Sequence, residues 1–162
     1  MNFALAAIST QLSQGTASLK AVLRDFEPFE IEKISSIYRR IEEATEGTLS
    51  SDLVVAFRLR TNMDLQSVKR KVRALASEHP ATKVYLLSFN HDVILDPKMP
   101  LPHPDLHADT LILHCAAEIE GGFEHPVLGR SLQELVKSSQ PRDGQSRFEF
   151  LSRGESLLSS SS

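Results

Sequence analysis

The segment between Asp52 and Phe89 constrains the fold most, because it predicts a strand, a helix and a second strand in succession. In Asp52–Thr61 the residues alternate between two faces as in a strand, with Leu53, Val55, Phe57 and Leu59 on one face and Arg58 and Arg60 on the other. Asp64 then has the chemistry of a helix cap for Leu65–Glu78, whose apolar residues recur with helical spacing. Pro80 ends that helix, and Lys83–Phe89 predicts the second strand.

The N-terminal third has a similar order. Phe3–Ile8 predicts a buried strand, a helix follows from Thr16 or Ser18 to Phe26, and Glu30–Tyr38 predicts another strand. Arg40–Ser51 is polar and is interpreted as a loop. The order is therefore βαββαβ, and two such units laid side by side form a four-stranded antiparallel sheet with helices on one face. We expect an α+β fold of the ferredoxin-like type with added C-terminal helices, which leaves the other sheet face to a ligand or to those helices.

The C-terminal half predicts shorter elements. In chain order these are a short strand, a proline-rich loop, a helix with Asp105 as its N-cap and a second short helix: Val93–Leu95, Asp96–Pro104, Asp105–Ile119 and Leu132–Val136. From Ser138 onward the chain is rich in Ser, Gln, Arg and Gly. We therefore predict one domain over residues 1–137 and a flexible tail over 138–162, in which Phe148, Phe150 and Leu151 have the apolar side chains needed to dock locally.

Composition narrows the classes of function. The net charge of −3 argues against nucleic acid or an anionic membrane as a partner. No apolar run reaches the length of a membrane span, and the apolar start Met1–Ile8 lacks the basic residues of a signal peptide. The single cysteine, Cys115, cannot form an internal disulfide and is interpreted as a small core residue. We expect a cytoplasmic protein.

Three stretches of the C-terminal half carry a family resemblance: Leu101–His107, Leu111–Ile119 and His125–Gly129. They resemble the corresponding part of the hydroxymethyldihydropterin pyrophosphokinases (HPPK), folate-pathway enzymes that transfer pyrophosphate from ATP to a pterin alcohol. The resemblance extends over most of residues 3–136 and is strongest from Phe89 to Gly129. It implies the ferredoxin-like core predicted above, with ATP and a pterin as candidate ligands.

The residues that perform the chemistry in that family are largely replaced. Its first strand ends in Gly-Ser-Asn-Leu, where this chain has Ser9–Leu12, and its pterin-binding Asn is replaced by Val54. Its two metal-binding Asp residues lie two apart on a strand and therefore share a face. Lys83 and Tyr85 occupy those positions here, and the arginine-rich loop before them is shortened to Glu78–Thr82. Magnesium needs oxygen ligands, and phosphoryl transfer needs its charge, so the resemblance argues against a magnesium site.

Some nucleotide-binding positions are retained. His103 matches an ATP-contacting His, while Lys98 and Arg73 match basic positions near the nucleotide. These three are the candidate cofactor-binding residues, and no catalytic or metal-binding residue is assigned. Asp109 stands where the family usually has Arg, and Leu111 replaces its pterin-stacking Phe.

Two further patterns have a structural interpretation that we favour. His103, Asp105, His107 and Asp109 have metal-ligand chemistry, with His114 and Cys115 nearby, but the prolines among them indicate an entry from a loop into a helix. The basic stretch Lys69–Arg73 has the chemistry to steer a phosphate, but a solvated helix face is the simpler interpretation.

Three hypotheses of function follow. The first is a weakly active or non-catalytic binding or regulatory protein that takes ATP or a pterin, with another folate-pathway protein as a candidate partner. The second is an active pyrophosphokinase with a magnesium site rebuilt from other carboxylates, among Asp92, Asp96, Asp105 and Asp109, of which Asp92 needs the least rearrangement. The third is a protein-interaction module that uses the open sheet face.

Overall fold

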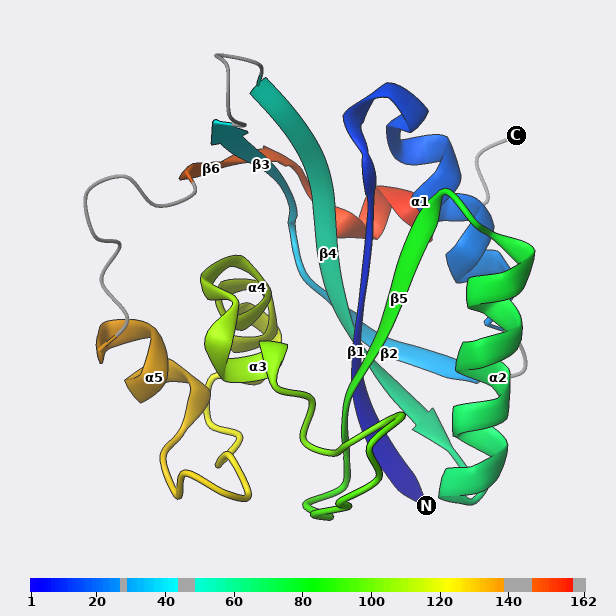
Figure 1. Cartoon of the computed structure of the whole chain (residues 1–162), viewed down its shortest axis with the longest axis vertical. Coiled ribbons are helices and arrows are strands. Elements are labelled where there is room, and N and C mark those ends of the chain that lie inside the picture. The colour runs from blue at the N-terminus through cyan, green and yellow to red at the C-terminus, as the bar shows by residue number, and fades with distance from the viewer. Residues whose placement is uncertain (27–28, 44–48, 139–146, 159–162) are drawn as a thin grey trace.

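An antiparallel sheet organises the residues that the computed structural model describes, which are 1–26, 29–43, 49–138 and 147–158. Its six strands in this part of the chain are β1 (Asn2–Gln11), β2 (Glu30–Ile34), β3 (Ile37–Glu43), β4 (Leu49–Thr61), β5 (Thr82–Phe89) and β6 (Arg147–Ser152). The order is β5-β1-β4-β3-β6, and β2 also pairs with β4 (Figure 1). This is the predicted α+β, ferredoxin-like arrangement, extended at one edge by β6.

The two central strands are buried on both faces of the sheet. In β1 the residues Ala4, Ala6 and Ile8 enter one core, while Leu5 and Ala7 enter the other. β4 divides its side chains in the same way, and the four residues predicted to share a face do so: Leu53, Val55, Phe57 and Leu59. Burial on both faces explains why β1 is a continuous apolar run rather than an alternating one.

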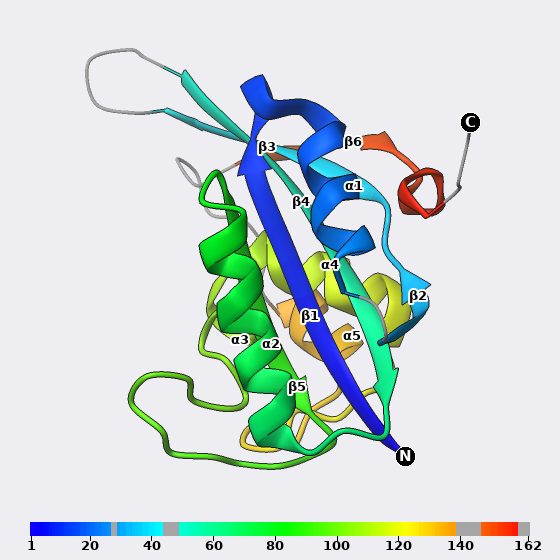
Figure 2. The same cartoon turned by 90° about the vertical axis from the view of Figure 1, so that its right-hand side faces the viewer.

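Helices α1 (Gly15–Arg24) and α2 (Leu65–Glu78) cover the first face (Figure 2). Their apolar stripes pack on the strand residues named above, with Phe26 edge-on against Phe57 at 5.0 Å between ring centroids. The predicted cap of α2 is confirmed, because the Asp64 side chain accepts a hydrogen bond from the Ser67 amide at 2.9 Å.

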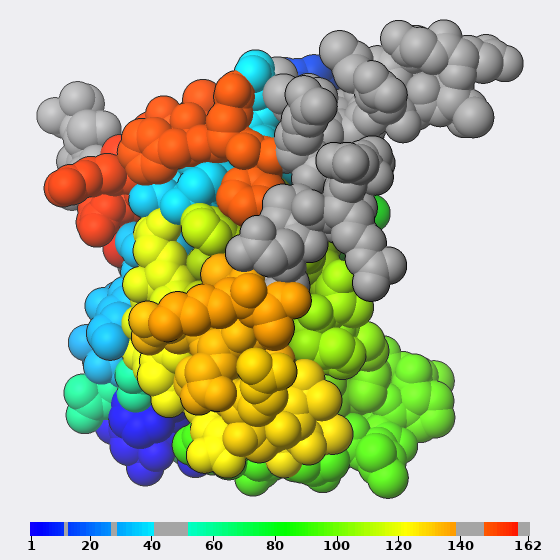
Figure 3. Space-filling view, turned by 90° about the vertical axis from the view of Figure 1, so that its left-hand side faces the viewer, coloured from blue at the N-terminus to red at the C-terminus, as the bar shows by residue number. Residues whose placement is uncertain are grey.

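The opposite face carries the added helices α3 (Asp105–Ala108), α4 (Thr110–Glu120) and α5 (Leu132–Ser138). α4 lies against β4, and α5 packs outside it, where it forms part of the outer surface (Figure 3). No helix among the described residues is long and apolar enough to cross a membrane. Cys115 of α4 is fully buried in this core, as predicted.

The predicted helix Asp105–Ile119 is wrong in one respect, because it is broken at Asp109. Asp109 has extended backbone angles, and its side chain accepts hydrogen bonds from the amides of Leu111 and Ile112 at 3.0 and 3.1 Å. It is therefore the cap of α4, whereas the Asp105 side chain caps no helix. His103 precedes α3, so His103 and His107 are not stacked on one helical face.

The predicted strand Glu30–Tyr38 and the predicted loop Arg40–Ser51 also need correction. β2 and β3 are separated at Ser35 and Ser36, and both pair with the long strand β4. The Ser35 hydroxyl accepts the amide of Ala56 at 2.9 Å, so a side chain replaces a backbone acceptor at the break. β3 continues to Glu43 and β4 begins at Leu49, because pairing between the strands outweighs the polar composition. Residues 44–48 of the predicted loop lie outside the described residues. The predicted strand Val93–Leu95 is reduced to one bridge between Ile94 and Leu101.

Part of the predicted tail is structured. β6 pairs with β3, and Phe148 and Phe150 both contact Tyr38 edge-on, at 5.9 and 6.2 Å between ring centroids, although Phe150 and Leu151 are 59% and 42% exposed. After β6, Gly154 approaches the backbone of Ser35 so closely that a β-carbon there would overlap its carbonyl oxygen. Residues 139–146 and 159–162 lie outside the described residues, and the domain boundary at 137 stays a prediction.

Candidate functional site

Lys83 and Tyr85, the positions that the sequence resemblance aligns with two metal carboxylates, lie at the start of the edge strand β5. In the register of the sheet, Lys83 pairs with Ser9 and Tyr85 with Ala7 of β1. Both side chains belong to the face that α3 and α4 cover, because Leu87, two residues further along, enters that core. Lys83 is exposed and Tyr85 is half-buried.

Tyr85 packs against His103, and these two residues form a strip on this face of the sheet. Their rings meet edge to face at 5.5 Å between centroids, and the amide of His103 donates to the Leu87 carbonyl at 2.8 Å. Burial, reinforced by the charge of Asp105, raises the pKa of Tyr85, so its phenol is neutral near pH 7. Burial lowers the pKa of His103, whose Nδ1 accepts the amide of Asp105 at 3.0 Å. The neutral ring therefore carries its proton on Nε2.

Asp109 and Leu111, which the sequence resemblance aligns with an Arg and a Phe, both have structural roles. Both carboxylate oxygens of Asp109 accept hydrogen bonds from the Arg40 guanidinium at 2.8 Å, while one of them caps α4. Leu111 is buried in the core beneath α4. Neither side chain presents a group to a ligand in this arrangement.

The three candidate nucleotide-binding residues are not gathered into one site by any contact between described residues. Arg73 is exposed on α2, which covers the first face of the sheet. His103 contacts Tyr85 on the opposite face. Lys98 is exposed in the loop after β5, where its amide donates to Asp96 at 3.0 Å. That loop is fastened to α2 by an ion pair of 3.2 Å between Asp96 and the buried Lys69.

The carboxylates considered for a rebuilt magnesium site are also dispersed. Asp96 and Asp109 are each engaged by a cation, Lys69 and Arg40 respectively. Within the part of the chain that the structure describes, the one group of acidic and histidine side chains with metal-like spacing is Asp25, Glu78 and His79. This group lies at the C-terminal ends of α1 and α2, away from the strip formed by Tyr85 and His103, and its Asp25 and His79 already pair with each other at 2.8 Å.

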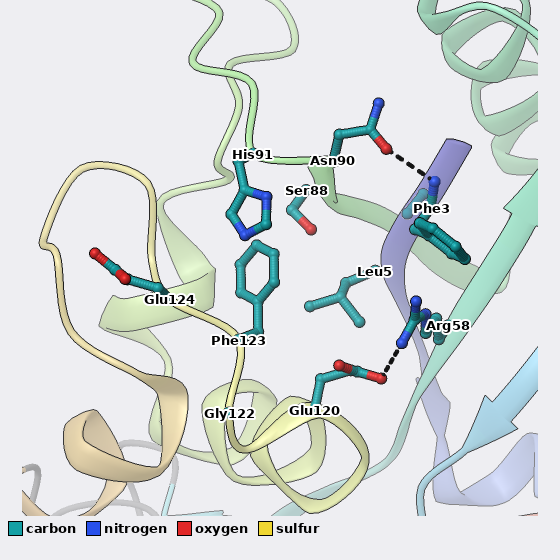
Figure 4. Close-up of a pocket in the computed structure, with 11 residues that line it drawn as sticks. Phe3, Leu5, Arg58, Ser88, Asn90, His91, Glu120, Gly122, Phe123 and Glu124 are labelled. Carbon is teal, nitrogen blue, oxygen red and sulfur yellow. Dashed lines mark hydrogen bonds and ion pairs between the residues drawn. The ribbon is translucent and has the colours of Figure 1, made fainter. Parts of the chain in front are cut away.

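A cavity of about 440 Å³ lies at the other end of the same sheet face. Its lining comes from the start of β1, from β4, from the end of β5 and the turn after it, and from the segment that follows α4: Phe3, Ala4, Leu5, Arg58, Ser88, Asn90, His91, Glu120, Gly122, Phe123 and Glu124 (Figure 4). Asn90 fixes the turn at the end of β5 through its Oδ1, which accepts the Phe3 amide at 3.0 Å.

Charged side chains form one side of this cavity. Oε1 of Glu120 accepts hydrogen bonds from Arg58 and, at 3.0 Å, from Lys33. Burial alone would raise the pKa of Glu120, but the two cations outweigh it and hold the pKa below its usual range. Glu120 is therefore a carboxylate at neutral pH.

No sequence signal indicates this cavity. Its residues come from four separate segments and form no motif, and each of the two aromatic residues, Phe3 and Phe123, is consistent with an ordinary core or loop position. Only the pairing of β1 with both β4 and β5 brings Leu5 beside Arg58 and Ser88.

Comparison with solved structures finds this fold in HPPK-DHPS of Plasmodium falciparum. The wild-type protein matches with a TM-score of 0.71 at 12% identity, over 85% of this chain and 44% of that chain. A variant crystallised with pteroate matches with a TM-score of 0.69 at 13% identity, over 85% of this chain and 43% of that one. The chain thus spans less than half of the length of these proteins, and the likeness shows an HPPK-like fold. No protein-family model and no curated protein matches the sequence.

Proposed function

We propose that this chain is a binding or regulatory protein of the folate pathway that keeps the pyrophosphokinase fold but transfers pyrophosphate weakly or not at all. The observation that carries the proposal is the pair Lys83 and Tyr85 at the start of β5, the positions that match the family's metal carboxylates. Pyrophosphoryl transfer depends on cations that neutralise the phosphate charge. An ammonium group and a neutral phenol cannot hold such a cation.

The surroundings of this pair support the same conclusion. The Tyr85 ring packs edge to face against the His103 ring. The raised pKa of Tyr85 keeps its phenol from becoming an anionic ligand. The carboxylate of Asp109, six residues after His103, accepts hydrogen bonds from Arg40 and from the first amides of α4. We therefore propose that the chain binds ATP or a pterin without converting it. Arg73, Lys98 and His103 are the proposed nucleotide contacts.

Calorimetric titration of the whole chain with a non-hydrolysable ATP analogue, with and without magnesium, tests the proposal. We expect binding with the same affinity in both conditions, and little or no turnover of ATP with hydroxymethyldihydropterin. Absence of binding in both conditions would contradict ATP as a ligand and favour a protein partner. Turnover that needs magnesium and is abolished by Asp92→Asn would instead establish the rebuilt metal site.

A gain-of-function variant directly tests the alignment of Lys83 and Tyr85 with the family's metal carboxylates. The double substitution Lys83→Asp and Tyr85→Asp places two carboxylates on one face of β5, and we expect it to introduce magnesium-dependent binding of the analogue. The matched control, Lys83→Asn with Tyr85→Asn, changes the same positions without charge. Equal magnesium affinity of the two double variants, with both folded by circular dichroism, would contradict the assigned positions.

A further inference from the structure

The C-terminal ends of α1 and α2 meet on the first face of the sheet, opposite the strip formed by Tyr85 and His103 (Figure 2). Three residues with metal-ligand chemistry lie there. Asp25 and His79 are the C-caps of the two helices, and Glu78 is the last residue of α2. One ligand atom from each residue lies within 4.8 Å of the other two. Because Asp25 and His79 are 54 residues apart in the chain, only the fold brings them together.

Hydrogen bonds at the helix ends hold the backbone of these residues in place. The amide of Asp25 donates to the carbonyls of Ala21 and Val22 at 3.2 and 3.1 Å. The amide of His79 donates to the carbonyl of Leu75 at 2.9 Å, and Leu75 is itself fully buried in the core. The three side chains are therefore carried by anchored helix ends, which position ligands more precisely than loops do.

The charge of this group favours a cation. A neutral His79 leaves two carboxylates uncompensated within the group, and a protonated His79 compensates only one of them. Both helices also present the negative ends of their dipoles here, where carboxylates are locally unfavourable. α2 has no basic residue in its last turn, and α1 has one, Arg24. A local conflict of this kind is typical of functional positions.

The donor atoms select the class of cation. One imidazole nitrogen with two carboxylate oxygens suits zinc and related transition metals, whereas magnesium and calcium prefer oxygen ligands alone. Nε2 of His79 lies 2.8 Å from Oδ2 of Asp25. Two ligand atoms of a tetrahedral zinc ion stand about 3.4 Å apart, given bond lengths of about 2.0–2.2 Å. A small rotation of the exposed Asp25 side chain therefore admits the ion, and water completes its coordination.

We propose that Asp25, Glu78 and His79 bind a divalent transition-metal ion of the zinc class. The ion replaces the hydrogen bond between Asp25 and His79 and joins α1 to α2. Since α1 belongs to the first strand-helix-strand unit of the fold and α2 to the second, the ion cross-links the two units and stabilises the folded chain. The site shares no residue with Lys83 and Tyr85 or with the proposed nucleotide contacts.

Zinc titration of the metal-free whole chain tests this site. We expect calorimetry to show a single Zn²⁺ ion bound per chain, and Mg²⁺ in large excess should not displace it. In ¹H–¹⁵N spectra the largest shifts should fall on the amides of Asp25, Glu78 and His79. Free Zn²⁺ at about 100 times its dissociation constant should raise the melting temperature by about 5–10 °C, because the site exists only in the folded chain.

Conservative substitutions locate the binding. Asp25→Asn, Glu78→Gln and His79→Gln should each lower the Zn²⁺ affinity by at least about tenfold, because loss of even an outer-shell partner of a metal site costs about that much. The matched control is His107→Gln, which removes an exposed histidine of α3 on the opposite face and should bind Zn²⁺ as the parent chain does. Circular dichroism establishes that each variant is folded.

Four outcomes would each overturn the proposal. These are absence of Zn²⁺ binding by the parent chain, unchanged affinity in all three ligand variants, a loss in His79→Gln alone, and equal losses in His107→Gln and His79→Gln. The shifts in the parent chain provide a reading that needs no substitution, and shifts centred elsewhere would also contradict the site. No nucleotide is present in these titrations, so their result is independent of whether the chain binds ATP or transfers pyrophosphate.

Discussion

Replacement of Asp109 tests the structural role that the fold gives to this residue. Its carboxylate accepts two amides at the start of α4 and two hydrogen bonds from Arg40, and the two side chains are only 19% and 16% exposed. Loss of a helix cap costs about 1 kcal/mol. Loss of a charge-assisted pair at this depth costs about 1–2 kcal/mol, between the values for exposed and for buried pairs.

We therefore expect Asp109→Ala to lower the free energy of unfolding by about 2–3 kcal/mol. Asp109→Asn keeps an oxygen that can cap α4 and should lose only the charge-assisted part, about 1–2 kcal/mol. In a thermal melt the alanine variant should fall by about 5–10 °C for a chain of this size. Urea denaturation followed by circular dichroism measures both changes.

The control for this series is Asp105→Ala, in the preceding helix α3. The Asp105 side chain caps no helix, so this substitution should change stability by less than about 0.5 kcal/mol. A double-mutant cycle between Asp109→Asn and Arg40→Ala should return a coupling free energy of about 1 kcal/mol or more. Equal losses in Asp105→Ala and Asp109→Ala, or no coupling with Arg40, would refute the assignment of Asp109 as cap and partner.

Three other features of the structure lead to predictions. Gly154→Ala should destabilise the chain by more than about 1 kcal/mol, because its β-carbon would overlap the Ser35 carbonyl, whereas Gly122→Ala meets open space and serves as the control. Cys115 is fully buried, and burial raises the pKa of its thiol, so a thiol reagent should modify it only as fast as the chain unfolds; rapid modification of the native chain would count against that burial. Burial, followed by the charge of His107, lowers the pKa of His125 in the fold, so the unfolded state binds more protons as the pH falls through about 6.5. The urea midpoint should therefore decrease between about pH 7.5 and about pH 5.5, less so in His125→Asn, and a midpoint that does not change with pH would contradict this.

The sequence predicted best where the signal is local. Leu53, Val55, Phe57 and Leu59 share one face of β4 because alternation is a property of the strand itself. Asp64 caps α2 because the acceptor and the amide of Ser67 are three residues apart. The order of strands and helices followed from such local periods, and with it the ferredoxin-like arrangement.

The sequence failed where two local interpretations competed. Asp105 and Asp109 are both chemically suited to cap a helix, and the guanidinium of Arg40, far away along the chain, binds the second of them. The polar stretch after Arg40 resembles a loop, yet β3 and β4 extend into it because each supplies the other's hydrogen-bond partners. β6 was missed as a strand for the same reason, since its pairing with β3 is not visible in its own composition.

The sequence by itself determined the periods of the strands and helices and the chemical character of each position, including the ammonium and phenol at Lys83 and Tyr85. Only the tertiary structure decided which of these side chains meet. It separates Arg73 from His103 by placing them on opposite faces of the sheet, and it joins Phe3, Arg58 and Phe123 around one cavity. The physical reason is that periodicity is encoded between near neighbours, whereas a cavity is a property of strand register and helix packing between residues far apart in the chain.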